Sequence, residues 1–156
     1  MTTRSAGWRG IAALATAALA ACTPPSGQGL PKGQLDTLIG QAIGDPSTCV
    51  LLADRATGKV VYQYGDDANC ARPLPECDAS GVMNARAALQ LASQPGGRMQ
   101  SCASTADGSR TVGWAEARVQ SAKRDLVYSA VMEGANALPG HEINARLYDA
   151  FAKAGL

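Results

Sequence analysis

The chain has 156 residues, a formal net charge of +1 and 46% hydrophobic residues, which is enough apolar material for one compact domain. This composition excludes a disordered chain, which would combine low hydrophobicity with high net charge. It also excludes a nucleic-acid-binding surface, because arginine and lysine are scattered and aromatic residues make up only 4% of the chain.

Residues 1–21 have the composition of a bacterial lipoprotein signal peptide. Two arginines precede the apolar run 11–21, which is shorter than the ~20 apolar residues that a membrane-spanning helix needs. The run ends in Leu-Ala-Ala-Cys, which resembles a lipobox and implies cleavage just before Cys22, with palmitate-type acylation of that cysteine. We therefore expect Cys22 to anchor a lipoprotein in the outer membrane, facing the periplasm. An ordinary secretory signal is the alternative.

The segment 22–33 is rich in proline, glycine and serine and has no periodic apolar face. This composition predicts a flexible tether between the lipid anchor and the fold. Residues 34–156 then form a single domain.

Within the domain, apolar residues recur with the period of a helix in some segments and of a strand in others. The predicted elements are helices at 34–43, 82–92 and 142–154, and strands at 49–54, 59–64, 98–104, 110–119 and 126–132. The turn 55–58 joins the first two strands into a hairpin. Gly155 is the expected C-terminal end of the last helix.

The stretch 72–85 is a proline-braced turn that leads into the predicted helix 82–92. Asp78 or Ser80 is positioned to cap this helix, whose free N–H groups attract negative charge. A carboxylate at such a position serves either as a simple cap or as a nucleophile or general base. The simple cap is the favoured interpretation of Asp78, and no catalytic residue is expected in this stretch.

The same stretch resembles the nucleophile helix of class D serine β-lactamases and their penicillin-binding relatives. That helix opens on Ser-Thr-Phe-Lys-(Ile/Val)-Pro-Asn-(Ala/Thr), often with a cysteine before the serine. Cys77 matches this cysteine, but Asp78 stands in the place of the serine and Gly81 in the place of the lysine. The family activates its serine with that lysine, so both catalytic side chains are missing here.

Two further segments extend the resemblance. Residues 112–116, Val-Gly-Trp-Ala-Glu, are similar to the Val-Gly-Trp-(Val/Ala)-Glu strand of the family and are the most specific match. The third strand of the family carries Lys-Thr-Gly, whereas residues 100–103 read Gln-Ser-Cys-Ala. The large helical insertion of the family is absent between residues 92 and 98, and most of the substrate cleft is lost with it.

The resemblance implies an α+β fold with a five-stranded antiparallel sheet. The hairpin 49–64 would lie beside the last strand. The N- and C-terminal helices would cover one face of the sheet and the helix 82–92 the other.

The four cysteines that follow Cys22 are an even number in an exported chain, which favours disulfides. Zinc is the weaker interpretation, because there is no Cys-x-x-Cys pair and His141 is the only histidine. If the fold follows the resemblance, Cys77 and Cys102 approach each other where the substrate pocket would have been. Cys49 then pairs with Cys70, although a Cys70–Cys77 pair stays open.

We therefore expect a non-catalytic module of the bacterial envelope, with a binding or structural role and no cofactor or metal. One alternative is a residual β-lactamase-like or peptidoglycan-processing enzyme that uses Asp78. Another is an accessory subunit or inhibitor of an envelope complex, in which an exposed strand edge pairs with a protein partner. The residues of that edge are Ser101, Cys102, Ala103 and Ser104.

Overall fold

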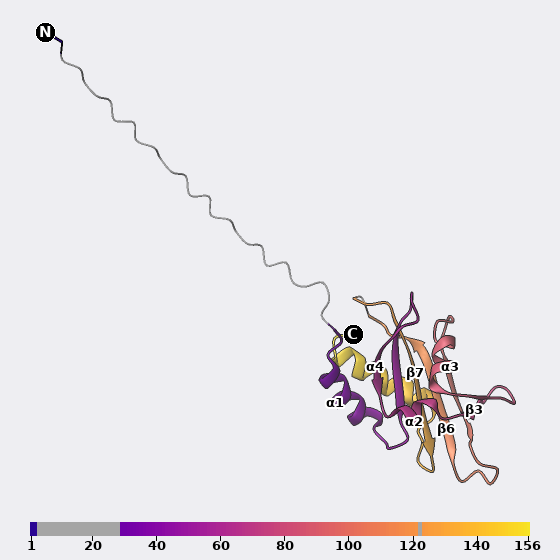
Figure 1. The fold of residues 1–156 in the computed structure, drawn as a ribbon. Helices are drawn as coiled ribbons and strands as arrows, with labels where there is room; N and C mark the ends of the chain where they lie inside the picture. The colour runs from indigo at the N-terminus through magenta and orange to yellow at the C-terminus, as the bar shows by residue number, and fades with distance from the viewer. Residues whose placement is uncertain (3–28, 122) are drawn as a thin grey trace.

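The computed structural model describes residues 1–2, 29–121 and 123–156, in which a central sheet lies between two layers of helices (Figure 1). The helices are α1 (Lys32–Ile43), α2 (Asp67–Ala71), α3 (Ala85–Leu91) and α4 (Gly140–Lys153). The strands are β1 (Cys49–Asp54), β2 (Val60–Tyr64), β3 (Leu74–Pro75), β4 (Val82–Met83), β5 (Arg98–Ala103), β6 (Thr111–Arg118) and β7 (Leu126–Gly134). Cys22, the apolar run before it and most of the predicted tether lie outside the described residues.

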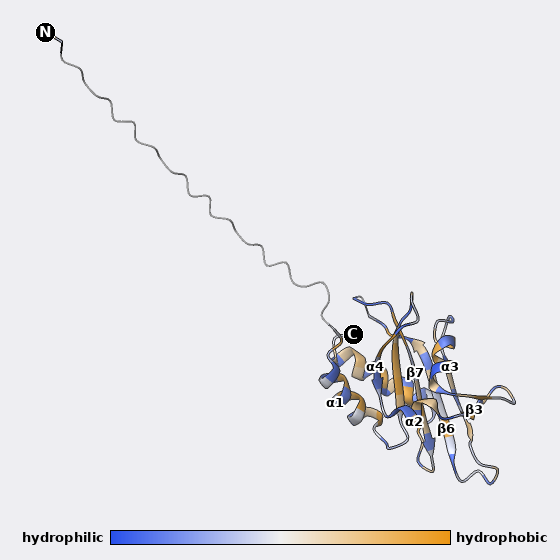
Figure 2. Ribbon diagram, in the orientation of Figure 1, coloured by the Kyte–Doolittle hydropathy of each residue, from blue (hydrophilic) through white to orange (hydrophobic). Residues whose placement is uncertain are grey.

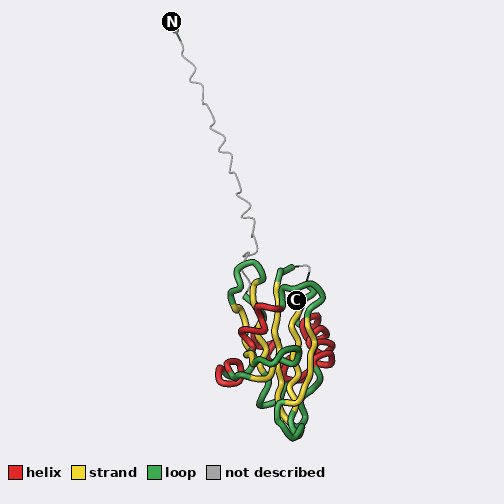
Figure 3. Tube along the Cα trace, turned by 90° about the vertical axis from the view of Figure 1, so that its right-hand side faces the viewer, coloured by secondary structure: helices red, strands yellow, loops and turns green. Residues whose placement is uncertain are grey.

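The main sheet has five strands in the order β2-β1-β7-β6-β5, and every neighbouring pair is antiparallel. Figure 3 shows these strands side by side along the length of the domain. The predicted α+β class with a five-stranded antiparallel sheet is confirmed. The hairpin of β1 and β2 lies beside β7, the last strand in sequence. β3 and β4 form a separate two-stranded sheet.

The terminal helices α1 and α4 cover one face of the sheet, as Figure 1 shows. Each helix contributes an apolar stripe at helical spacing, and both stripes pack against the strand side chains that point to the same face. The buried helix residues of this core are Leu35, Ile39, Ile43, Ile143, Leu147 and Phe151. Burying one such side chain stabilises the fold by about 1.5–3 kcal/mol.

The opposite face is covered by α3, α2 and the β3–β4 hairpin, around the fully buried Trp114. The Trp114 Nε1–H donates to the carbonyl of Pro75 at 2.9 Å, so the hairpin is tied to the sheet. β7 is covered on both sides, and eight of its nine residues are buried. Figure 2 shows hydrophobic colour along the strands and hydrophilic colour concentrated in loops and on outer helix surfaces.

Gly140, the first residue of α4, lies directly against the backbone of β5 and β6. A Cβ built on Gly140 would come within 2.1 Å of the Trp114 carbonyl oxygen and 2.6 Å of the Gln100 N, so only glycine fits. At the other end of α4, Gly155 has a φ of +78°, the left-handed conformation that commonly ends a helix. Gly140 therefore sets how closely α4 approaches the sheet, and Gly155 sets where the helix ends.

Candidate functional site

The segment that resembles the nucleophile motif forms a hairpin instead of the start of a helix. β3 pairs with β4, and the N–H of Glu76 donates to the Gly81 carbonyl at 3.0 Å across the turn 76–81. Asp78 and Gly81, at the positions of the family's serine and lysine, lie in this turn. Free N–H groups at a helix start therefore do not surround Asp78.

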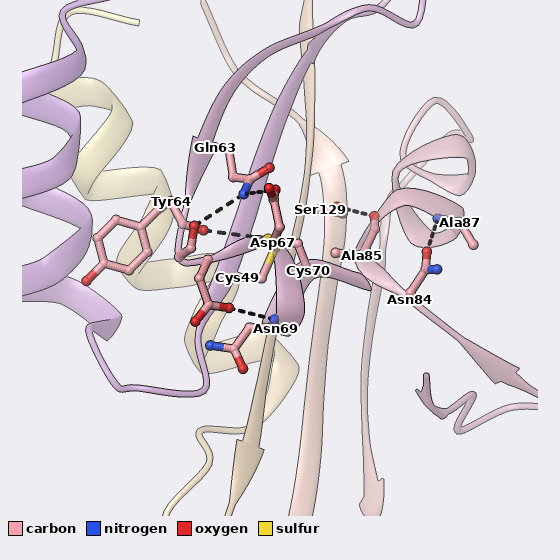
Figure 4. Close-up of a disulfide and its surroundings, with 12 residues drawn as sticks. Cys49, Gln63, Tyr64, Asp67, Asn69, Cys70, Asn84, Ala85, Ala87 and Ser129 are labelled. Atoms are coloured by element: carbon pink, nitrogen blue, oxygen red, sulfur yellow. Dashed lines mark hydrogen bonds between the residues drawn. A yellow bond between two sulfur atoms is a disulfide. The ribbon is translucent and has the colours of Figure 1, made fainter. Parts of the chain in front are cut away.

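The helix itself begins later than its periodicity suggested. Asn84 is the N-cap of α3, and its side-chain oxygen accepts a hydrogen bond from the Ala87 N–H at 3.0 Å (Figure 4). The prediction that Asp78 or Ser80 caps this helix is wrong, because Asn84 already accepts a hydrogen bond from one of the free N–H groups. The two residues predicted to open the helix pair with β3 instead.

The side chain of Asp78 faces β5 and accepts a hydrogen bond from the Gln100 amide. It remains 67% exposed, and the Arg98 guanidinium lies 3.6 Å from it. With a carboxylate at 78 and no side chain at 81, these two positions hold neither a hydroxyl nor an amine. The proton transfer that activates the family's serine therefore has neither its hydroxyl donor nor its amine acceptor at this place.

Two disulfides flank this region. Cys49 of β1 is bonded to Cys70 of α2 (Figure 4), and Cys77 of the turn is bonded to Cys102 of β5. These are the two pairs that the resemblance favoured over a Cys70–Cys77 bridge. The second bridge fastens the turn 76–81 across β5, where the resemblance placed the substrate pocket.

Arg98, at the start of β5, lies among three carboxylates. Its guanidinium is 3.4 Å from Glu76, 3.6 Å from Asp78 and 3.9 Å from Glu116. The Arg98 side chain is only 18% exposed, so solvent screens these pairs less than it screens pairs on an open surface. This arginine joins the turn 76–81 to the sheet by charge, beside the covalent bond of Cys77.

Glu116 is the most unusual member of this group. Its side chain is 0% exposed, and neither carboxyl oxygen has a hydrogen-bond partner among the described residues. Burial raises the pKa of Glu116 to about 7, while the positive charge of Arg98 acts in the opposite direction. Glu116 was not among the predicted site residues, although the period of two places it on the same buried face as Val112 and Trp114.

β5 is an edge strand, and one of its two edges carries unpaired backbone groups. The N–H of Ser104 donates to the Arg110 carbonyl at 2.9 Å, so the even-numbered residues of β5 are those whose backbone bonds to β6. The N–H and C=O groups of Met99, Ser101 and Ala103 then point away from β6. No strand in the described part of the chain pairs with this edge.

The structure divides the predicted edge residues Ser101, Cys102, Ala103 and Ser104 into two groups. Ser101 and Ala103 present their backbone to the free edge, whereas Cys102 and Ser104 bond to the neighbouring strand. The Ser101 hydroxyl also accepts a hydrogen bond from the Gly140 N–H at 2.8 Å, which fixes β5 under the start of α4. The edge is thus held rigidly from the face that α4 covers.

A second buried carboxylate, Glu133 of β7, is fully paired. It accepts hydrogen bonds from Arg110 at 2.8 and 2.7 Å, from the Ser104 hydroxyl at 2.7 Å, and from Arg72. The pKa of Glu133 falls to about 2, mainly because of the Arg110 hydrogen bond. Glu133 therefore stays ionised near neutral pH, and it has a structural role at the far end of β5.

A groove of about 580 Å³ lies on the α4 side of the sheet, next to the start of β5. Its apolar lining includes Met99, Val119, Tyr148, Phe151 and Leu156. Met99 belongs both to this groove and to the free edge of β5. Arg118, Gln120 and Asn144 also line the groove, so its surface is mainly apolar with a few polar side chains at its border.

His141 is the second residue of α4, and its side chain is exposed. In the described ranges, no group of three or more histidine, cysteine, aspartate or glutamate side chains is arranged to hold a metal ion. None of the helices described there is long and apolar enough to span a bilayer.

We compared the chain with known proteins, and no protein-family model, curated protein or solved structure matches it.

Proposed function

We propose that this chain is a non-catalytic binding module of a lipid-anchored lipoprotein of the bacterial envelope. Its binding element is the free edge of β5, which pairs with an extended segment of another envelope protein. The observation that carries this proposal is the row of outward backbone groups on Met99, Ser101 and Ala103. Such a row recruits an extended partner strand through main-chain hydrogen bonds.

The state of the turn 76–81 supports a binding role over a catalytic one. The positions of the family's nucleophile and base hold Asp78 and Gly81, and the Cys77–Cys102 bridge fastens the turn across β5. A strand that is held in place by a disulfide and by α4 favours strand addition, because little conformational entropy is lost when the partner binds.

Photo-crosslinking in the native envelope tests the proposal. A photoreactive residue at Met99, which is 36% exposed, is expected to crosslink to a partner protein. The same residue at Val61, which is 42% exposed on the opposite edge strand β2, is the matched control and is expected to give no such product. Equal products from both positions, or none from either, would overturn the binding edge.

A second substitution asks whether backbone hydrogen bonds carry the interaction. Ala103→Pro removes an N–H that points to the free edge, and proline is tolerated at such positions of edge strands. Combined with the photoreactive residue at Met99, this variant is expected to lose the crosslink, whereas Ala103→Ser keeps it. Far-UV circular dichroism of both variants shows whether the fold is retained.

The enzymatic alternative is tested separately with a fluorescent penicillin and with nitrocefin. We expect no covalent labelling and no turnover, because the positions of the serine and the lysine hold Asp78 and Gly81. If the purified protein is labelled covalently, and one point substitution abolishes this labelling, then the protein is an enzyme and the proposal of a non-catalytic binding module is wrong.

A further inference from the structure

The buried acid Glu116 takes no part in the binding edge as described so far. Its two carboxyl oxygens and the Gln100 Oε1 are the buried side-chain polar atoms that lack a hydrogen-bond partner in the described chain. All three are acceptors when Glu116 is ionised. Protonation turns one Glu116 oxygen into a donor, so a neutral carboxyl suits this environment far better than a carboxylate.

The groups packed around Glu116 offer little compensation for a negative charge. Arg98 of β5 lies directly opposite, with its guanidinium 3.9 Å from the carboxyl, and its positive charge favours ionisation. Glu76 and Asp78 of the turn 76–81 act against ionisation. From β7, Ser129 is the register partner, but its hydroxyl donates to a carbonyl of α3 at 2.7 Å.

α3 and β7 both contact β6, the strand that carries Glu116. α3 contributes buried alanine and leucine side chains, and its arginine, Arg86, is exposed. Tyr128 of β7 points to the opposite face, where burial keeps its pKa far above neutral, so this tyrosine stays uncharged. Glu116 is therefore the group in this cluster whose charge changes near neutral pH.

Arg98 links the charge of Glu116 to the turn. With Glu116 neutral, the Arg98 guanidinium forms ion pairs with Glu76 at 3.4 Å and with Asp78 at 3.6 Å. Both ion pairs hold the turn 76–81 on β5. With Glu116 ionised, a third carboxylate at 3.9 Å competes for the same guanidinium. The five N–H donors of one guanidinium are then shared among three carboxylates, so each donor that turns toward Glu116 is lost to Glu76 or Asp78 and the contacts with the turn weaken.

We propose that Glu116 is a proton-operated switch that controls how firmly the turn 76–81 is held on the edge strand β5. In the neutral state Arg98 fastens the turn, and in the ionised state Arg98 moves toward Glu116 and the turn loosens around its disulfide. This role rests on the proposed function, because the strand that carries Arg98 and Gln100 is also the binding edge. The pKa of Glu116, which burial raises to about 7, places the change near neutral pH.

The switch is tested directly on the disulfide-intact domain by nuclear magnetic resonance. The carboxyl carbon of Glu116 is expected to titrate with a midpoint near 7 in the unmodified protein. A midpoint below about 5, close to the value of a solvated glutamate, would overturn the proposal. This measurement needs no variant and therefore does not depend on whether a variant folds.

Amide hydrogen exchange then reports on the turn. After correction for the intrinsic effect of pH, exchange of the Glu76 and Ala79 amides, which donate hydrogen bonds within the turn, is expected to rise about fivefold between pH 6 and pH 8, the effect of weakening two partly exposed ion pairs. Glu116→Gln, which is neutral at every pH, is expected to abolish this rise. Glu142→Gln, at an exposed acid of α4, is the matched control and leaves it unchanged. A rise that persists in Glu116→Gln would overturn the switch.

Crosslinking from Met99 at pH 6 and pH 8 separates the switch from the proposed function. A yield that differs between the two pH values in the unmodified protein, but not in Glu116→Gln, supports control of the edge. A yield that is the same at both pH values removes the control of the edge by Glu116 and leaves the binding edge standing. No crosslink at either pH removes the binding edge, and with it this role of Glu116.

Discussion

Arg98 and Glu116 lie directly opposite each other on β5 and β6, yet their nearest charged atoms stay 3.9 Å apart. Arg98 is closer to Glu76 and Asp78 of the turn, so the fully buried acid is left without a hydrogen bond. Arg98 therefore pairs mainly with the carboxylates of the turn, and the buried Glu116 carboxyl is left without a close partner that would offset its desolvation. This arrangement makes the pH dependence of the protein measurable at a single residue.

We expect Glu116 to make the fold less stable as the pH rises. Its pKa in the folded state, about 7, lies above its ordinary value of 4.5, so its contribution is complete below pH 4.5 and is lost as the pH rises to about 7. The loss amounts to about 3 kcal/mol, because one pKa unit corresponds to about 1.36 kcal/mol. Urea unfolding at pH 4.5 and pH 8 measures it as a difference between the unmodified protein and Glu116→Gln. Stability differences that are equal at both pH values would contradict this expectation.

Glu133 is expected to have the opposite pH dependence. Its pKa of about 2 lies below its ordinary value, so its contribution is complete above pH 4.5 and is lost as the pH falls toward 2. At pH 7, Glu133→Gln should cost about 2–4 kcal/mol, less than a fully buried pair, because Arg72 and Arg110 are partly exposed. Glu142→Gln, which breaks an exposed pair with Arg146, should cost less than about 1 kcal/mol. Similar costs for both variants in chemical denaturation would show that burial of Glu133 has little effect.

The start of α3 provides a test of the local structure. Asn84→Ala should lower the free energy of unfolding by about 1 kcal/mol, because the Ala87 N–H loses its acceptor. Ser80→Ala should have almost no effect, since Ser80 is exposed and lies before β4. The reverse order of the two effects would place the helix start where the periodicity alone suggested it.

The two disulfides should differ in their accessibility to a reducing agent. Cys49 and Cys70 are 0% and 1% exposed, whereas Cys77 and Cys102 are only half-buried. Under native conditions, the Cys77–Cys102 bridge should therefore be reduced first. Mass spectrometry after brief treatment with dithiothreitol and alkylation identifies the order. Earlier alkylation of Cys49 would show that the core around β1 opens before the turn.

Both bridges should nevertheless contribute similarly to equilibrium stability. They join residues that are 21 and 25 positions apart, so the loop-closure entropy they remove from the unfolded chain is nearly equal. Replacing either pair with serines should cost about 3 kcal/mol. A much larger loss for Cys49–Cys70, measured by thermal unfolding, would show that packing of its buried sulfurs adds to the entropic term.

The predictions from sequence were accurate where short-range patterns dominate. The β1–β2 hairpin follows from two apolar runs joined by the turn 55–58, and β1 has the predicted bounds. α1 and α4 follow from apolar stripes with helical spacing, each observed to begin two residues earlier than predicted. β7 extends two residues beyond the predicted strand because it pairs with β6 as far as Gly134.

The errors arose where a local pattern competes with distant contacts. Val82 and Met83 fit the helical stripe that follows them, but they pair with Pro75 and Leu74 in a hairpin that the Trp114 side chain holds against the sheet. α2 was not predicted, because five residues carry too little periodicity to be recognised. Its place depends on the disulfide between Cys70 and Cys49, which are 21 positions apart.

The amino-acid sequence by itself determined the α+β class and the number of strands in the main sheet, because periodic apolar faces and turn residues act over a few positions. It also determined that positions 78 and 81 hold no hydroxyl and no amine. Only the tertiary structure decided which charges meet. Arg98, Glu76 and Glu116 are far apart in sequence, and a carboxyl's partners and its pKa depend on strand register and on what covers each face of the sheet.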